Sequence, residues 1–171
     1  MSERPFVLWL FGDIYCSWTR LLLVRIRELQ SGNAAKLELG WRPLPLRPEN
    51  EAALRAVEFA RDLDRELADR VLDGLCEAAA AGLLDALDPR SLLAVCERLG
   101  LDGEGVRHAV SDGRYDAELT RAEDEAERYG IDCVPTLLIG SRKIVGAAPT
   151  DLLAAEVEAQ MASLPAENED K

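Results

Sequence analysis

Residues 6–26 read FVLWLFGDIYCSWTRLLLVRI, and the change of periodicity within this stretch decides the fold. The continuous apolar run at 6–11 has the length of a strand that is buried on both faces of a sheet. From Trp18 onward the apolar residues recur at helical spacing, and residues 31–33 (Ser-Gly-Asn) end the pattern. The sequence therefore predicts a strand, a loop that carries Cys16, and a helix that begins beside this thiol.

A second strand and a long helical region are expected further along the chain. Leu37, Leu39 and Trp41 alternate with polar residues or glycine, which predicts a strand parallel to the first through a right-handed crossover. From Asn50, a candidate N-cap, to Tyr129 we find only helical signals. This region is predicted to form a bundle of four or five short helices.

The strand pattern returns after the helical region. Residues 136–139 and 143–145 have strand composition, and residues 140–142 (Gly-Ser-Arg) between them have the composition of a turn. A last helix follows this hairpin. The order of elements predicts an α/β fold with a helical insertion between the second and third strands.

Composition and charge restrict the function. The chain has 171 residues, of which 48% are hydrophobic, which is enough for one domain with a substantial core. Its 32 acidic and 20 basic residues give a formal net charge of -12, the wrong sign for binding a nucleic-acid backbone. The first apolar run is too short for a signal peptide core or a membrane span, so we expect a cytoplasmic protein without a membrane partner.

The four cysteines carry the candidate chemistry. Cys16, Cys76, Cys96 and Cys133 are far apart and contain no CxxC pair, and the chain has a single histidine, so no metal site is expected. In a reducing compartment these residues are free thiols. Cys76 and Cys96 lie among apolar residues at helical spacing, which favours core packing.

Cys16 is the candidate nucleophile. A sulfur at a helix N-terminus faces unpaired backbone N–H groups and the positive end of the helix dipole, and both favour the thiolate. Thr19 follows one helical turn later and is expected to direct its hydroxyl to the sulfur, but a hydroxyl cannot resolve a mixed disulfide. The alternative is that Cys16 is a small apolar side chain that packs in a loop.

Four segments, in this order, resemble the DsbA family of thioredoxin folds, and in particular its FrnE-like cytoplasmic branch. They are residues 13–19 (DIYCSWT), 41–48 (WRPLPLRP), 130–136 (GIDCVPT) and 144–149 (IVGAAP). The family is related to the kappa-class glutathione transferases and the 2-hydroxychromene-2-carboxylate isomerases. Its redox motif is Cys-Pro-Trp-Cys, whereas this chain has Cys-Ser-Trp-Thr at 16–19.

The resemblance implies a domain organisation. Residues 1–49 and 130–165 are expected to form a discontinuous thioredoxin-like domain. Residues 50–129 are expected to form the inserted helical domain, and residues 166–171 a polar tail.

The resemblance also assigns roles to the residues around the thiol. Pro135 corresponds to the cis-proline of the family, which lies against the active-site sulfur, and Val134, Pro135 and Thr136 are expected to bind substrate. Cys133 is a candidate resolving thiol for Cys16, and a packing role for it is equally open. Trp18 is expected to contact substrate, with core packing as the alternative.

Three functions remain open. The first is a thiol–disulfide oxidoreductase that works through the single thiol Cys16 on protein thiols, protein disulfides or glutathione, with glutathione as a co-substrate and no tightly bound cofactor. The second is an enzyme like the kappa-class transferases or the isomerases. The third is a redox-inactive module that binds peptides. The oligomeric state is left open, with a dimer as one option.

Overall fold

The computed structural model describes residues 5–32 and 37–163 and has the predicted α/β fold. Its strands are β1 (Phe6–Gly12), β2 (Leu37–Pro43), β3 (Thr136–Ile139) and β4 (Arg142–Val145). The helices are α1 (Ser17–Gly32), η1 (Pro48–Asn50), α2 (Glu51–Leu63), α3 (Arg65–Ala80), α4 (Pro89–Arg98), α5 (Gly103–Ser111), α6 (Asp116–Arg128) and α7 (Thr150–Ala162). Helices α2 to α6 lie between β2 and β3, where the sequence predicts a helical block. The predicted polar tail at 166–171 lies outside the described residues.

The strands form one mixed sheet in the order β2-β1-β3-β4. Strand β1 pairs in parallel with β2, so Gly12 lies opposite Pro43, and it pairs antiparallel with β3, so Phe11 lies opposite Thr136. The end of β1, the end of β2 and the start of β3 therefore meet at one edge of the sheet. The loops that follow or precede them must lie side by side.

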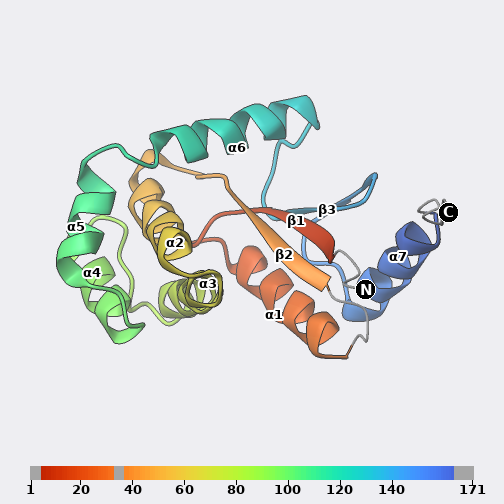
Figure 1. The fold of residues 1–171 in the computed structure, drawn as a ribbon, viewed down its shortest axis with the longest axis horizontal. Coiled ribbons are helices and arrows are strands. Elements are labelled where there is room, and N and C mark those ends of the chain that lie inside the picture. The colour runs from red at the N-terminus through yellow and green to blue at the C-terminus, as the bar shows by residue number, and fades with distance from the viewer. Residues whose placement is uncertain (1–4, 33–36, 164–171) are drawn as a thin grey trace, which may run out of the picture.

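Helices cover both faces of the sheet. Figure 1 shows α1 and α7 on one side of the strands and α6 on the other, with α2 to α5 grouped beyond the strand ends. Residues of β1 alternate between these layers, because successive side chains of a strand point to opposite faces. Leu8 and Leu10 belong to the main hydrophobic core, whereas Phe11 packs with Ala126 and Leu138 in a second cluster beneath α6.

The main core is continuous from the sheet into the inserted helices. It contains fully buried side chains of β1, α1, α2 and α3, among them Leu10, Ile26, Leu54 and Leu75. The insertion therefore shares one core with the strands. Burying these side chains provides most of the stabilisation that holds it in place.

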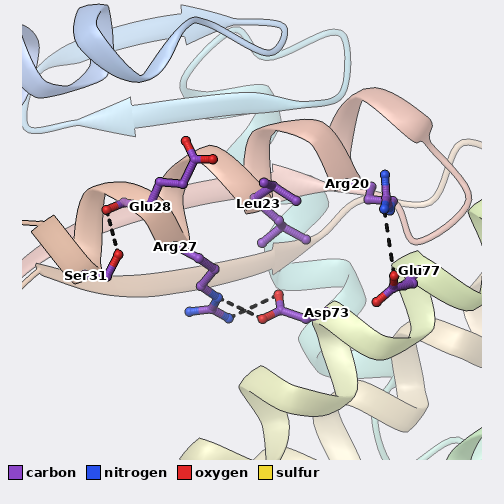
Figure 2. Close-up of a pocket in the computed structure, with 8 residues that line it drawn as sticks. Arg20, Leu23, Arg27, Glu28, Ser31, Asp73 and Glu77 are labelled. Atoms are coloured by element: carbon purple, nitrogen blue, oxygen red, sulfur yellow. Dashed lines mark hydrogen bonds and ion pairs between the residues drawn. The ribbon is translucent and has the colours of Figure 1, made fainter.

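Polar contacts also fasten the insertion to α1 (Figure 2). Arg27 Nε of α1 donates to Asp73 Oδ2 of α3 at 2.9 Å. A second pair joins the same two helices, with Arg20 Nη2 of α1 3.9 Å from Glu77 Oε1 of α3. These charged side chains line a cleft of about 560 Å³ between the two helices. No thiol lines this cleft, so we assign it to the interface between the helices.

On the opposite face, α6 is held to the sheet by Arg42 of β2. The guanidinium of Arg42 pairs with Glu125 of α6 and lies 3.8 Å from the ring centroid of Trp9. Helix α6 leads directly into the segment before β3. Its attachment to β2 therefore helps to place that segment.

The core-packing prediction for two cysteines is confirmed. Cys76 is 1% exposed and Cys96 is fully buried. Burial raises the pKa of the Cys76 thiol and raises the pKa of Cys96 to about 12, so both remain protonated at neutral pH. Neither is suited to act as a nucleophile.

Asn50 occupies the predicted N-cap position of α2, but its side chain does not cap the helix. Asn50 has helical backbone angles of φ -78 and ψ -17, is the last residue of η1, and makes no capping bond to α2. Instead its Nδ2 donates to Asp13 Oδ2 at 2.8 Å. The side chain turns toward the β1–α1 loop because a buried carboxylate there needs donors.

Glu58 is expected to oppose stability at neutral pH. It is 3% exposed on α2, its Oε2 accepts from Arg61 at 2.9 Å, and its Oε1 has no partner within the described residues. Burial raises the pKa of Glu58, although the charge of Arg61 opposes the shift. The Glu58 carboxyl therefore binds its proton more tightly in the folded state than in the unfolded state. The stability that this protonation contributes is fully present below the unfolded pKa and is lost as the pH rises through the folded pKa.

We therefore predict that Glu58→Gln raises the Tm at pH 7.5 by about 2–4 °C, the size of a gain of about 1 kcal/mol in a chain of this length. At pH 4 the gain is expected to be smaller, because the carboxyl is then already largely protonated in the folded state. Thermal unfolding followed by circular dichroism at both pH values measures this, with Glu104→Gln at an exposed site as the control. A lower Tm for Glu58→Gln at pH 7.5 would contradict the prediction.

Candidate functional site

The site lies where the loop after β1 meets the segment before β3. The antiparallel pairing of Phe11 with Thr136 fixes these two segments next to each other. Across this junction the Cys16 thiol donates to the carbonyl oxygen of Val134, with an Sγ to O distance of 3.8 Å. The structure thus brings together residues that are 118 positions apart in the chain.

Cys16 occupies the N-terminal boundary of α1. Its N–H donates to Asp13 O at 3.1 Å, and its carbonyl accepts from Arg20 N–H at 3.2 Å, which closes the first helical turn. Cys16 is partly exposed to solvent, in contrast to Cys76 and Cys96 in the core.

Thr19 does not make the predicted hydrogen bond to the Cys16 sulfur within the described residues. The side chain is fully buried, and its Oγ1 accepts from the backbone N–H of Asp13 at 3.4 Å. Its methyl group packs so closely on Gly12 that a Cβ added there would lie 2.7 Å from Thr19 Cγ2. Thr19 points into the core beneath the loop. There its hydroxyl accepts from the Asp13 N–H, and its methyl group fills the space next to Gly12, which has no side chain.

The segment before β3 forms the second wall of the site. The Val134–Pro135 peptide bond is cis, Pro135 is buried, and the Pro135 carbonyl accepts from Gly146 N–H at 2.8 Å. Thr136 is fully buried, and its Oγ1 donates to Cys133 O at 2.8 Å. These bonds hold the backbone of 133–136 in one conformation.

Cys133 lies at the edge of this wall. Its thiol is partly exposed, and its Sγ lies 4.0 Å from Thr136 Oγ1. Cys16 and Cys133 are both free thiols. Cys16 contacts the carbonyl of Val134, the residue that follows Cys133, so the two thiols belong to adjoining segments.

Trp18 is 61% exposed on the first turn of α1. The alternative that it packs in the core is therefore wrong. A large apolar surface beside Cys16 is available to a partner. Tyr15, on the other side of the thiol, is partly buried, and burial followed by the charge of Asp13 raises its pKa to about 12, so its hydroxyl is neutral at physiological pH.

Asp13 is the residue at this site whose role sequence reasoning missed. It is fully buried, and it accepts hydrogen bonds from Tyr15 N–H at 2.8 Å, Leu46 N–H at 2.6 Å and Asn50 Nδ2 at 2.8 Å. A buried carboxylate is tolerated when several donors satisfy it. Asp13 thereby joins the thiol loop, the proline-rich segment after β2 and the start of the insertion.

A sequence signal for Asp13 exists, although it is local. An aspartate directly after a buried strand, two residues before a residue whose N–H it can accept, is typical of an Asx turn. That signal accounts for the bond to Tyr15. The contacts to Leu46 and Asn50 depend on the tertiary fold.

A hollow of about 400 Å³ lies beside the thiol loop. It is lined by Tyr15, by Leu46 and Arg47 of the proline-rich segment, and by Leu87 of the loop after α3. Leu46 and Leu87 are 57% and 79% exposed. Exposed apolar surface of this kind favours contact with another molecule.

Two other kinds of site were sought in the described residues. Within 5–32 and 37–163, no group of three or more His, Cys, Asp or Glu side chains is placed to hold a metal ion. Over the same residues, no helix has the length and apolarity needed to cross a membrane.

Comparisons with known proteins agree with this geometry. A family model described as "DSBA-like thioredoxin domain" matches residues 7–158. No match is found among curated proteins. Solved structures provide the remaining similarities.

Three of these structures are oxidoreductases or thiol-exchange proteins by their descriptions. A probable DsbA oxidoreductase from Streptomyces coelicolor has a TM-score of 0.80 and 17% identity, and the match covers 96% of this chain and 94% of that one. A thioredoxin-like oxidoreductase from Silicibacter pomeroyi has a TM-score of 0.79 and 18% identity, covering 92% and 87%. The thiol-disulfide exchange protein alpha-DsbA2 from Wolbachia pipientis has a TM-score of 0.79 and 18% identity, covering 92% and 83%. At this identity the likeness shows the fold.

We predict that Asp13→Ala lowers the free energy of unfolding by about 3 kcal/mol, because it leaves one buried and two partly buried donors without their acceptor. Urea unfolding at pH 7 measures this loss. Asp124→Ala, at an exposed position of α6, serves as the control and is expected to stay within about 0.5 kcal/mol of the wild type. Equal stability of the two variants would show that the hydrogen bonds of Asp13 do not stabilise the fold.

Proposed function

The chain belongs to the DsbA-like thioredoxin-domain family of thiol–disulfide oxidoreductases, and from this premise we propose that it exchanges disulfides through the single thiol of Cys16. One observation carries the proposal. Cys16 is a partly exposed residue at a helix N-terminus, and its sulfur contacts the carbonyl of Val134, immediately before Pro135. The sulfur therefore lies next to the N-terminus of α1 on one side and next to the backbone of 133–136 on the other.

The helix N-terminus supports a nucleophilic thiol. The first backbone N–H groups of α1 have no carbonyl one turn earlier, and the helix dipole is positive at this end. We propose that both favour negative charge on the Cys16 sulfur as it reacts. The thiolate is the species that attacks a disulfide.

The proposed exchange has two balanced steps. The Cys16 thiolate attacks one sulfur of a partner disulfide, a mixed disulfide forms, and the other partner sulfur leaves as a thiolate. A second thiolate then attacks the partner sulfur of the mixed disulfide, the new partner disulfide forms, and Cys16 leaves as the thiolate. The net result is transfer of a disulfide between partners.

The second thiolate must come from outside the motif. Thr19 stands where the family motif has its second cysteine, and a hydroxyl cannot take part in disulfide exchange. We propose an external thiol, glutathione or a protein thiol, as the usual attacking group. Cys133 is the internal candidate, because it adjoins the residue whose carbonyl contacts Cys16.

The surroundings of the thiol suit a peptide partner. Trp18 presents an exposed apolar face, and the backbone of 133–136 lies along the other side of the sulfur. We propose that Trp18 and the Val134 backbone contact the partner chain, with Pro135 and Thr136 as the buried support of that wall. Backbone contacts of this kind give affinity for extended peptides with little dependence on their side chains.

We further propose that the chain belongs to the FrnE-like branch and works in the cytoplasm. This rests on the four segments quoted above and on the four free thiols. A reducing environment keeps such thiols unpaired. A pool of glutathione there also supplies the external thiol that the proposed cycle needs.

Intact-mass spectrometry after exposure to oxidised glutathione tests the nucleophile. We predict that the wild type gains one glutathione, that Cys16→Ser gains none, and that Cys133→Ser still gains it. If Cys133 resolves the adduct, the wild type instead accumulates an internal disulfide that Cys133→Ser lacks. Equal modification of the wild type and Cys16→Ser, or no modification of either, would reject Cys16 as the reacting thiol.

Restoring the second motif thiol tests the role assigned to Thr19. We predict that Thr19→Cys forms a 16–19 disulfide on oxidation and raises the rate of insulin reduction by dithiothreitol about tenfold or more, because the mixed disulfide can then be resolved within the motif. Thr19→Ser is the control, since it keeps a hydroxyl and adds no thiol. A Thr19→Cys protein that folds but stays as slow as Thr19→Ser would mean that the loop does not present Cys16 to partners.

A further inference from the structure

A second cavity lies among α4, α5 and the β1–α1 loop, and it shares Tyr15, Asp85 and Ala86 with the hollow beside the thiol loop. Its volume is about 500 Å³, within the range of sites that hold small organic molecules. Its wall is mainly apolar and includes Ala52, Leu92, Leu93, Val106 and Val110. Tyr15, the neighbour of Cys16, also lines it.

The apolar wall is only partly covered by the protein itself. Leu92 and Val106 are buried, whereas Ala52, Leu93 and Val110 are partly buried residues that pack against the main core and face the cavity. Filling the cavity with an apolar group would remove this remaining surface from water. Each square ångström so covered contributes about 25 cal/mol.

The charged residues around the cavity differ in how they are engaged. Arg90 pairs with Asp88, with Nε 3.0 Å from Oδ1, and Asp85 accepts from Leu87 N–H at 2.9 Å. Arg107 is exposed and makes no ion pair with any residue in the described part of the chain. Asp85 also lacks an ion-pair partner in this part of the chain, but it accepts a backbone hydrogen bond, whereas the Arg107 side chain makes no hydrogen bond to the described residues, so its donors are free for a ligand.

The net charge of the protein does not override this local cation. At physiological ionic strength, interactions between exposed charges are screened over about 8 Å, so the distant carboxylates act weakly on a ligand in the cavity. An unpaired guanidinium at its edge acts directly. Carboxylates and phosphates are the groups whose geometry matches a guanidinium best.

We propose that this cavity binds small organic anions with an apolar body, such as a medium-length fatty acid or an aromatic carboxylate. The apolar body lies against Leu93, Val106 and Val110, and the anionic group pairs with Arg107. The site is independent of the redox proposal, because no thiol lines it. It lies beside the Cys16 loop through Tyr15.

Isothermal titration calorimetry with decanoate tests this in 0.15 M salt, with decanol and decyltrimethylammonium as probes of the same chain length and different head charge. We expect saturable one-site binding of decanoate, weaker binding of decanol, and the weakest binding of the cation. Arg107→Gln is expected to weaken decanoate binding about five- to tenfold and to leave decanol unchanged. Arg121→Gln, at an exposed site on α6, is the matched control and is expected to leave both unchanged.

Two variants that fill the cavity complete the test. Val110→Trp occupies it from α5, and Ala86→Trp occupies it from the loop after α3, so that one of them remains informative if the other fails to fold. Either folded variant is expected to lose decanoate binding, whereas Cys16→Ser is expected to retain it. The proposal is overturned if decanoate shows no saturable binding, if a folded Trp variant binds it as the wild type does, or if Arg107→Gln and Arg121→Gln behave alike.

Discussion

The pairing of β1 with two neighbours of opposite direction is the constraint on which the site depends. Parallel pairing with β2 brings the proline-rich segment to the end of β1, and antiparallel pairing with β3 brings residues 133–135 to the same end. A slip of either pairing by one residue would turn every side chain of a strand to the opposite face. The buried faces of β1 therefore fix the register, and the register fixes the contact between Cys16 and Val134.

Asp13 joins the loops at this end of the sheet by hydrogen bonds. Its carboxylate binds donors from three segments, and one of these donors belongs to the first residues of the insertion. The inserted helices and the thiol loop are thus joined at a single buried group.

Much of this fold could be predicted from the sequence, because its elements have strong local signals. The apolar run at 6–11, the helical spacing after Trp18 and the hairpin composition at 136–145 each correspond to an observed element. The position of Cys16 at the start of a helix could also be predicted, from the change of periodicity between the apolar run and Trp18. Asn50 lies at the predicted N-cap position and Thr19 one turn after Cys16, but their side chains bond to Asp13 rather than to α2 and to the sulfur. The role of Asp13 and the cavity near Tyr15 arise only when distant segments pack together, so no local sequence pattern predicts them.

A crystal structure of Cys16 trapped as a mixed disulfide with a short cysteine-containing peptide would test the central claim most directly. The account predicts that the peptide backbone lies along residues 133–135 and contacts the Val134 backbone, with Trp18 against its side chains. A peptide bonded to Cys133 instead, or one that leaves the 133–135 segment untouched, would contradict it.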